Sequence, residues 1–335
     1  MCERIINHRV HGVSRSIKNL NSPCYSVVLF LIIMLFVISA CSTPPKNPGD
    51  VFDIRGQAEA HLELGNRDAD RGDFKNALNK LDAAMTLAVA ADDSSLRIRV
   101  GLSRGNALFS LGRDEEMEEA WSGALAEAER IGNSELAAVS RVHIARGKLL
   151  STEKAEDMPA VAQSVRDEVS RNLAPIKDRY YTAFAWTIMG LAERELNRYP
   201  QAEAAVRRAL EIHEKDRYFE LAAYDWFLIA WFRSLNGNHR GAIQALESAI
   251  AFDRRVENSW GLASDWRALG VVRGYAGEAE ASGAAYLRAA EIFRAIGNDE
   301  ASGAAYLRAA EVFSAAGNEE AAEKARSLAE NGQNP

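Results

Sequence analysis

The sequence lacks several features on which common protein classes depend. It has 3 cysteines and 8 prolines in 335 residues, and all three cysteines fall at or before Cys41. So few cysteines exclude a disulfide-stapled fold, and so little proline excludes collagen-like and linker-like chains. Basic residues are fewer than acidic ones, 40 against 47. A nucleic-acid binder needs a basic surface, so we expect no nucleic acid as a partner.

Catalytic and metal-binding motifs are missing as well. The 6 histidines show no His-x3-His or His-Glu-x2-His spacing, and no cysteine follows Cys41, so no zinc site is expected. The sequence contains no G-x4-G-K or G-x-G-x2-G motif, which are the marks of phosphate-binding loops. We therefore predict that the chain is not an enzyme and has no cofactor, no metal and no small-molecule substrate.

An uninterrupted apolar run near the N-terminus is the first positive signal. Residues 27–38 are all apolar, the residues before them are polar and basic, and Ser39, Ala40 and Cys41 follow. The run spans about 18 Å as a helix, short of the roughly 30 Å hydrocarbon core of a membrane. This pattern is typical of a secretory signal. An uncleaved membrane anchor and a buried helix of the fold are the alternatives.

The segment from Ile38 to Cys41 resembles the lipobox of bacterial lipoproteins. The resemblance implies that residues 1–40 are a signal peptide and that Cys41 carries the lipid, palmitate included, because several acyl chains anchor a protein more firmly than one. Residues 41–50 would then form a proline-rich tether. Ser42, where a retained lipoprotein often has aspartate, implies the outer membrane, so we expect an envelope protein that faces the periplasm.

Residues 51–332 show a repeat with a period of about 40 residues. Apolar residues recur at helical spacing. Turn-forming residues recur at Gly72, Gly112, Asn197, Gly237, Gly277 and Gly317. A second series of small residues recurs at Gly65, Gly105, Gly147, Gly190, Ala230, Gly270 and Ala310. Two series with one period predict seven units of two helices each, an all-α solenoid.

The repeat units resemble the tetratricopeptide repeat (TPR) family. The clearest unit has Trp186-x2-Met189-Gly190, then Asn197-Arg198-Tyr199 and spaced alanines, which is the order of large, small and turn residues in that family. The resemblance implies a TPR-like α-solenoid with a longer period than the family's usual 34 residues, and HEAT-like helix pairs are the alternative. The third unit, around 147–172, matches poorly, and Pro159 is expected to begin its second helix.

A second duplication lies at the C-terminus. The segment Glu280–Glu291 recurs unchanged as Glu300–Glu311, which is an offset of half a unit. This offset predicts that one helix sequence serves as the second helix of unit six and as the first helix of unit seven. The charged last helix is expected to cap the array.

The TPR resemblance also implies a concave binding wall built from set positions of the first helices. Aromatic and cationic side chains at such positions favour a peptide or protein partner with acidic or carboxylate-terminated segments. Core packing of the aromatic residues is the alternative, because apolar residues lie inside by default. The predicted groove residues are Phe184, Leu191, Arg194, Tyr224, Phe227, Trp231 and Arg267, with Arg141 and Lys148 from the third unit.

These observations together predict a lipid-anchored scaffold or adaptor of the bacterial envelope. It would bind a protein or peptide partner through the concave face, in the assembly of an envelope complex. A purely structural spacer or multimerisation array without a specific groove is the first alternative. An envelope hydrolase with a site around Ser151–Pro159 is the second, and the absence of a nucleophile or metal motif in that segment counts against it.

Overall fold

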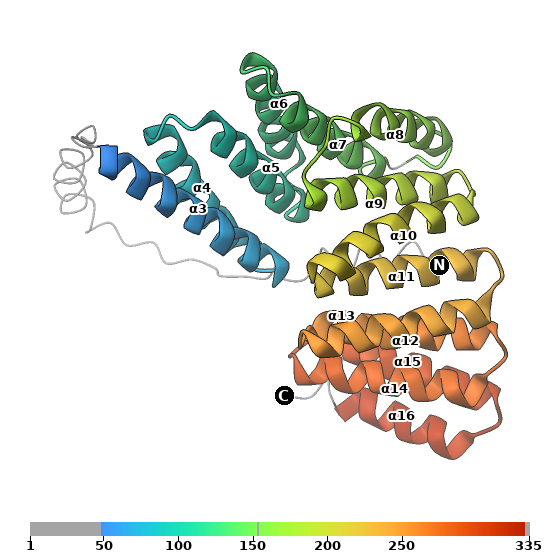
Figure 1. Ribbon diagram of the computed structural model, residues 1–335. Helices are drawn as coiled ribbons and strands as arrows, with labels where there is room; N and C mark the ends of the chain where they lie inside the picture. The colour runs from blue at the N-terminus through green and yellow to red at the C-terminus, as the bar shows by residue number, and fades with distance from the viewer. Residues whose placement is uncertain (1–47, 153, 332–335) are drawn as a thin grey trace, which may run out of the picture. The chain divides into compact units, whose positions relative to one another are not determined.

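The computed structural model describes residues 48–152 and 154–331, and all regular secondary structure in these ranges is α-helical. The predicted signal peptide and Cys41 lie outside the described residues. The helices follow one another in antiparallel pairs (Figure 1). They are α3 (Pro48–Asp70), α4 (Phe74–Ala90), α5 (Ser94–Ser110), α6 (Asp114–Arg130), α7 (Ser134–Leu150), α8 (Met158–Leu173), α9 (Arg179–Glu195), α10 (Tyr199–Asp216), α11 (Phe219–Leu235), α12 (His239–Arg255), α13 (Ser259–Tyr275), α14 (Ala279–Ala295), α15 (Asp299–Ala315) and α16 (Glu319–Asn331).

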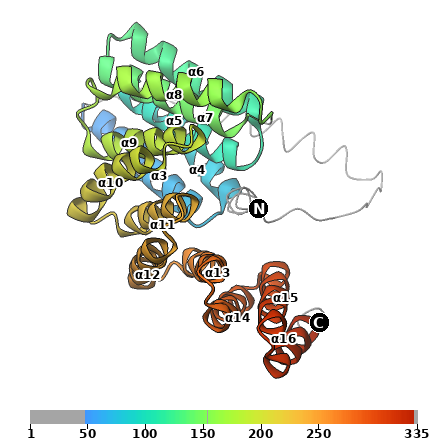
Figure 2. The same ribbon diagram turned by 90° about the vertical axis from the view of Figure 1, so that its right-hand side faces the viewer.

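The chain divides into two compact units, and the boundary falls within α7, after Ile144. In unit 1, α3 packs on α4, α4 on α5, and α5 on α6. In unit 2 the same holds from α8 to α16, and Figure 2 shows α12, α13 and α14 nearly end-on. The helices make seven pairs in all, which confirms the predicted TPR-like, all-α fold class.

The 40-residue period comes from the length of the helices and turns. Most helices, such as α5 and α11, have 17 residues. The residue with positive φ in each turn recurs at positions 72, 92, 112 and 132, so one helix and its turn take 20 residues. Asn197 has φ 57°, which confirms that it stands in for glycine. The sequence series found only alternate turns. The left-handed positions that it missed, at the ends of second helices, are Asp92, Gly132, Arg217, Glu257 and Gly297.

Side-chain caps begin several helices, as the polar turn residues predict. Asp73 accepts a hydrogen bond from the backbone N–H of Asn76, and Asn298 accepts one from Ala301. Asp114 is the first residue of α6, and Arg113 holds the N-cap position of that helix without a side-chain bond. The Asp114 carboxylate lies in the first turn, where a negative charge is favourable.

The second series of small residues marks the places where paired helices approach most closely. The glycines at 65, 105, 190 and 270 each face a larger residue 16 positions later on the second helix. A Cβ on Gly105 would lie 2.1 Å from Trp121 Nε1, and a Cβ on Gly190 would lie 2.5 Å from Val206 Cγ2. The absence of a side chain at these positions therefore lets the partner side chain fill the seam.

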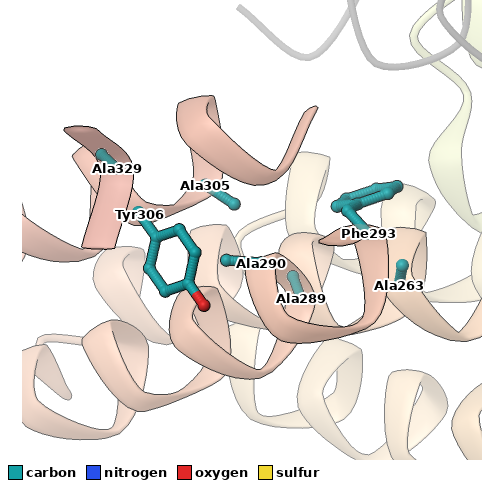
Figure 3. Packing of buried hydrophobic residues seen from close by; sticks show 7 residues of the cluster. All are labelled: Ala263, Ala289, Ala290, Phe293, Ala305, Tyr306 and Ala329. Carbon is teal, nitrogen blue, oxygen red and sulfur yellow. The ribbon is translucent and has the colours of Figure 1, made fainter. Parts of the chain in front are cut away.

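The duplicated segment folds as predicted, as α14 in the sixth repeat and as α15 in the seventh repeat. Ser282 Oγ donates to the Gly270 carbonyl at 2.6 Å, and Ser302 Oγ donates to the Ala290 carbonyl at 2.9 Å. The same sequence therefore makes the same bond to the preceding helix in both positions. Figure 3 shows the buried cluster beside it, which consists of Ala263, Ala289, Ala290, Phe293, Ala305, Tyr306 and Ala329.

The irregular third unit has a longer connection than the others. The segment from Ser151 to Asp157 separates α7 from α8, and Pro159 lies in the first turn of α8, as predicted. None of the helices described for this chain is long and apolar enough to cross a membrane.

Candidate functional site

The predicted groove residues of unit 2 lie on the first helices of three consecutive pairs. Phe184, Leu191 and Arg194 belong to α9, with the spacing that places side chains on one helix face. Tyr224, Phe227 and Trp231 repeat this spacing on α11, and Arg267 belongs to α13. We call the seven residues the inner stripe. Helices α11 and α13 contact each other, although they are not consecutive.

The two groove residues predicted from the third repeat lie in different compact units. Arg141 belongs to the part of α7 in unit 1, where its guanidinium pairs with Glu129 at 2.5 Å. Lys148 belongs to the part of α7 in unit 2 and is exposed. Arg141 is thus a cationic group of unit 1 and Lys148 is one of unit 2. Their role in binding stays a prediction.

Burial along the inner stripe is uneven. Leu191, Phe227 and Trp231 are buried, with 6%, 8% and 8% of their surface exposed. The other four residues, Phe184, Arg194, Tyr224 and Arg267, are half-buried. The stripe is therefore a largely covered apolar surface with half-open aromatic and cationic groups along it, and its use as a binding groove stays a prediction.

A cation–π contact joins two neighbouring first helices within the stripe. The Arg194 guanidinium lies 4.0 Å from the centre of the Trp231 ring, and Arg194 also pairs with Glu195. A guanidinium over an indole is the strongest form of this contact.

Trp231 Nε1 on α11 and Ser264 Oγ on α13 are buried polar atoms that have no hydrogen-bond partner among the described residues. Ser264 is 3% exposed and stands 40 residues after Tyr224, so it takes the same register position in the next unit. An unsatisfied buried donor costs about 1–3 kcal/mol. Donors of this kind on one face indicate a place where an external acceptor would be favourable.

Sequence reasoning missed Arg146, which lies on α7 in unit 2. Burial lowers the pKa of its guanidinium, and Tyr224 and Tyr180 oppose that shift. Arg146 thus adds a desolvated cation close to one residue of the inner stripe. It stands one residue before Gly147 of the small-residue series, a position that the family pattern assigns to the core, so no sequence signal marks it.

A buried polar network lies directly behind the stripe. His213 Nδ1 and Asp225 Oδ2 are 2.6 Å apart, and Thr187 Oγ1 donates to Asp225 Oδ1 at 3.4 Å. Burial raises the pKa of Asp225 to about 6, although its hydrogen bond with His213 acts in the opposite direction. The signal in the sequence was an aspartate within the apolar segment Leu221–Phe232, but spacing alone does not show its partner.

The described residues contain no group of three or more His, Cys, Asp or Glu side chains that could hold a metal ion.

No protein-family model matches the sequence, and none of the curated proteins does either. Solved structures do match. One is the STAND protein with a tetratricopeptide repeat sensor from Pyrococcus horikoshii, with a TM-score of 0.55, 15% identity and 84% of this chain covered. The chain spans only 43% of that protein's length.

Two further structures match over most of their own length. A Rap protein complexed with Competence and Sporulation Factor has a TM-score of 0.54 and 15% identity, covering 93% of this chain and 88% of that one. Aspartyl phosphate phosphatase F from Bacillus subtilis has a TM-score of 0.53 and 13% identity, covering 83% and 74%. At such low identity these matches show the TPR-like fold alone.

Proposed function

We propose that unit 2 is a binding scaffold that holds an extended peptide segment of a protein partner along the inner stripe. The observation that carries this proposal is the buried indole N–H of Trp231, which has no acceptor in the described part of the chain. A peptide carbonyl would supply that acceptor, and the Ser264 hydroxyl offers a second hydrogen-bond donor to the peptide. Preformed helices bind such a segment without ordering costs of their own.

Charge favours an acidic peptide over a basic one. The stripe and its surroundings contribute Arg194, Arg267, Arg146 and Lys148. Guanidinium groups bind carboxylates in a bidentate manner and in a defined orientation. A chain of the same fold, the Rap protein, was solved with a bound factor, which supports a binding role for this fold. The partner would be a protein or peptide with acidic side chains or a free C-terminal carboxylate.

A peptide panel tests this proposal directly. Acidic, neutral and basic peptides of one length are titrated against the whole chain and against its variant Trp231→Phe. This variant keeps an aromatic ring but removes the indole N–H. We expect acidic peptides to bind best and Trp231→Phe to weaken them about 5-fold, the value of one hydrogen bond. Trp266→Phe on α13 is the matched control and should bind as the wild type does. Equal binding by both variants would refute the assignment of the stripe.

We further propose that the scaffold is tied to the bacterial envelope by lipid on Cys41, on the periplasmic face of the outer membrane. The lipobox-like segment Ile38–Cys41 supports this proposal, and Cys41 lies outside the described residues. Fatty-acid labelling of cells that express Cys41→Ala should lose the label, whereas Cys24→Ala, in the same leader, should lose none. If Cys41→Ala keeps its label, the anchor is wrong. Separation of inner and outer membranes then tests the location.

A further inference from the structure

The duplicated helices α14 and α15 place the same leucine in different surroundings. Leu287 of α14 is partly buried and packs against two apolar clusters of unit 2. Its copy in α15, Leu307, is 47% exposed. The duplicated sequence around the two leucines is identical, so the place of α15 in the array, and not the sequence of the helix, exposes Leu307. A single exposed leucine is ordinary, and its meaning depends on the groups beside it.

Leu307 continues the face of the first helices that carries the inner stripe. It stands 40 residues after Arg267 and 80 residues after Phe227, so it has their register position in a later first helix. Phe227 is 8% exposed on α11, Arg267 is half-buried on α13, and Leu307 is 47% exposed on α15. Of these three helices, α15 therefore offers the most accessible side chain at this register position.

The residue that follows Leu307 reaches a tyrosine of the preceding helix. Tyr286 of α14 is 4% exposed, and its ring packs against Gly270 of α13, where an added Cβ would lie 2.9 Å away. Burial raises the pKa of the Tyr286 hydroxyl. The charge of Arg308 and its hydrogen bond act in the opposite direction, as the charge of Arg267 does. Guanidinium groups from α13 and α15 therefore act on one hydroxyl of α14.

This arrangement is not repeated one helix later. Tyr306 is the copy of Tyr286, but the residue 20 positions after Arg308 is Leu328, which has no charge. The guanidinium nearest to the Tyr306 ring is that of Arg294, 4.7 Å from the ring centre, and it donates to the Leu328 carbonyl at 2.6 Å. The repeat thus folds without an arginine at this position, and Arg308 is not a requirement of the helix packing.

Arg308 can bind a further acceptor. Its Nη1 donates to Glu311 Oε2 at 2.5 Å, and the two side chains are 47% and 60% exposed. A guanidinium has five N–H donors, and exposed ion pairs of this kind contribute little to stability. The same pair occurs in α14, where Arg288 donates to Glu291 at 3.0 Å. A carboxylate from a partner can therefore bind Arg308 together with Glu311 or in its place.

We propose that Leu307 and Arg308, with Arg267 and the Tyr286 hydroxyl beside them, recognise an acidic peptide segment in which an apolar residue neighbours the acidic one. The carboxylate binds the Arg308 guanidinium in the bidentate geometry that this group favours, and the apolar side chain covers Leu307. Positive charge from two helices selects an acidic segment over a basic one. This inference rests on the proposed binding of an acidic peptide, and it adds where the carboxylate and its apolar neighbour lie.

Three peptides of equal length, titrated calorimetrically against the whole chain, test the proposal. The first has an acidic residue beside an apolar one, the second has only the acidic residue, and the third has only the apolar residue. The wild type should bind the first most tightly. Leu307→Ala should weaken the first about 5-fold, because part of a leucine side chain is no longer buried, and should leave the second unchanged. Arg308→Gln should weaken both acidic peptides about 10-fold and reduce the salt dependence of their binding.

Arg288→Gln is the matched control, because Arg288 has the same helix sequence and the same glutamate partner on α14. It should bind all three peptides as the wild type does. All three substitutions lie at exposed or partly exposed positions, and circular dichroism checks that each variant folds. If Arg308→Gln weakens the acidic peptides no more than Arg288→Gln does, the proposal is wrong. It is also wrong if Leu307→Ala keeps the wild-type preference for the apolar neighbour.

The outcomes separate this inference from the proposed function. If the wild type binds acidic peptides, and Leu307→Ala and Arg308→Gln bind them equally well, only the present inference fails. If the wild type binds no acidic peptide, both fail. Sedimentation of the chain without peptide should be the same for the wild type and Leu307→Ala. Self-association that Leu307→Ala abolishes would assign this leucine to a second copy of the chain and overturn the proposal.

Discussion

In each unit, one pair of helices packs a glycine against a large aromatic side chain, and the aromatic residue differs between the two pairs. In unit 1, Gly105 of α5 faces Trp121 of α6, and in unit 2, Gly270 of α13 faces Tyr286 of α14. Trp121 comes closer, since a Cβ on its glycine would lie 2.1 Å from the indole, against 2.9 Å at Tyr286. The comparison teaches that the repeat fixes a small residue opposite a large one, whereas the identity of the large residue sets how tight the seam is.

The largest expected effect comes from removing the larger side chain. Trp121→Ala empties the tightest seam, where the indole is 1% exposed and donates to the Leu102 carbonyl at 3.1 Å. We expect a loss of about 3–5 kcal/mol in the free energy of unfolding, measured by urea unfolding of the whole chain. Tyr286→Ala should cost less. If the two substitutions cost the same, the difference in tightness between the seams is not real.

Adding a methyl group to the glycines sharpens the same comparison. Gly105→Ala should lower the free energy of unfolding by about 1–3 kcal/mol, because the new Cβ overlaps the indole and forces it aside. Gly270→Ala should cost less, because the ring at Tyr286 has more room to move.

Gly123→Ala serves as the control for both glycine substitutions. Gly123 lies within α6 with nothing within 4 Å of an added Cβ, so alanine should stabilise the chain by about 0.5–1 kcal/mol through helix propensity. A loss of stability at Gly123 would mean that glycine substitutions act through something other than the seams.

Helices α14 and α15 share a duplicated sequence but differ at their N-caps. Asn298 caps α15 through a bond from the Ala301 N–H, whereas Glu278 precedes α14 without a side-chain bond. Asn298→Ala should cost about 1 kcal/mol, and Glu278→Ala should cost little. Urea unfolding followed by circular dichroism measures both. An equal loss in the two variants would contradict the role of the cap.

Most of the fold was predictable because its signals are local and repeated. Gly72, Gly112 and their successors mark turns whose backbone needs a left-handed residue, and the period follows from counting. The partners of the small-residue series were not predicted. The rule that Gly105 meets Trp121 joins two different helices, and only coordinates show which large residue faces which glycine.

The candidate site was less predictable than the fold. The positions of Phe184, Tyr224 and Trp231 on first helices follow from register, but register does not tell how much of each ring is covered. The pairing of His213 with Asp225 crosses from one helix to the next, so neither residue carries a visible motif. Desolvation, which decides the charge state of Asp225, is a property of packing and is absent from the sequence.

The smallest effect concerns the turns, some of which have a glycine at the left-handed position and others a residue with a side chain. Gly237 ends α11 with φ 79°, but Glu257 ends α12 with φ 56°, in a region that costs a residue with a Cβ about 1 kcal/mol. Glu257→Gly should therefore raise the free energy of unfolding by about 0.5–1 kcal/mol, which calorimetry can measure, and Gly237→Ala should lower it by a similar amount. Because both turns have the same backbone shape, the two changes must have opposite signs. A loss of stability in both variants would show that Glu257 makes a contribution beyond its backbone conformation.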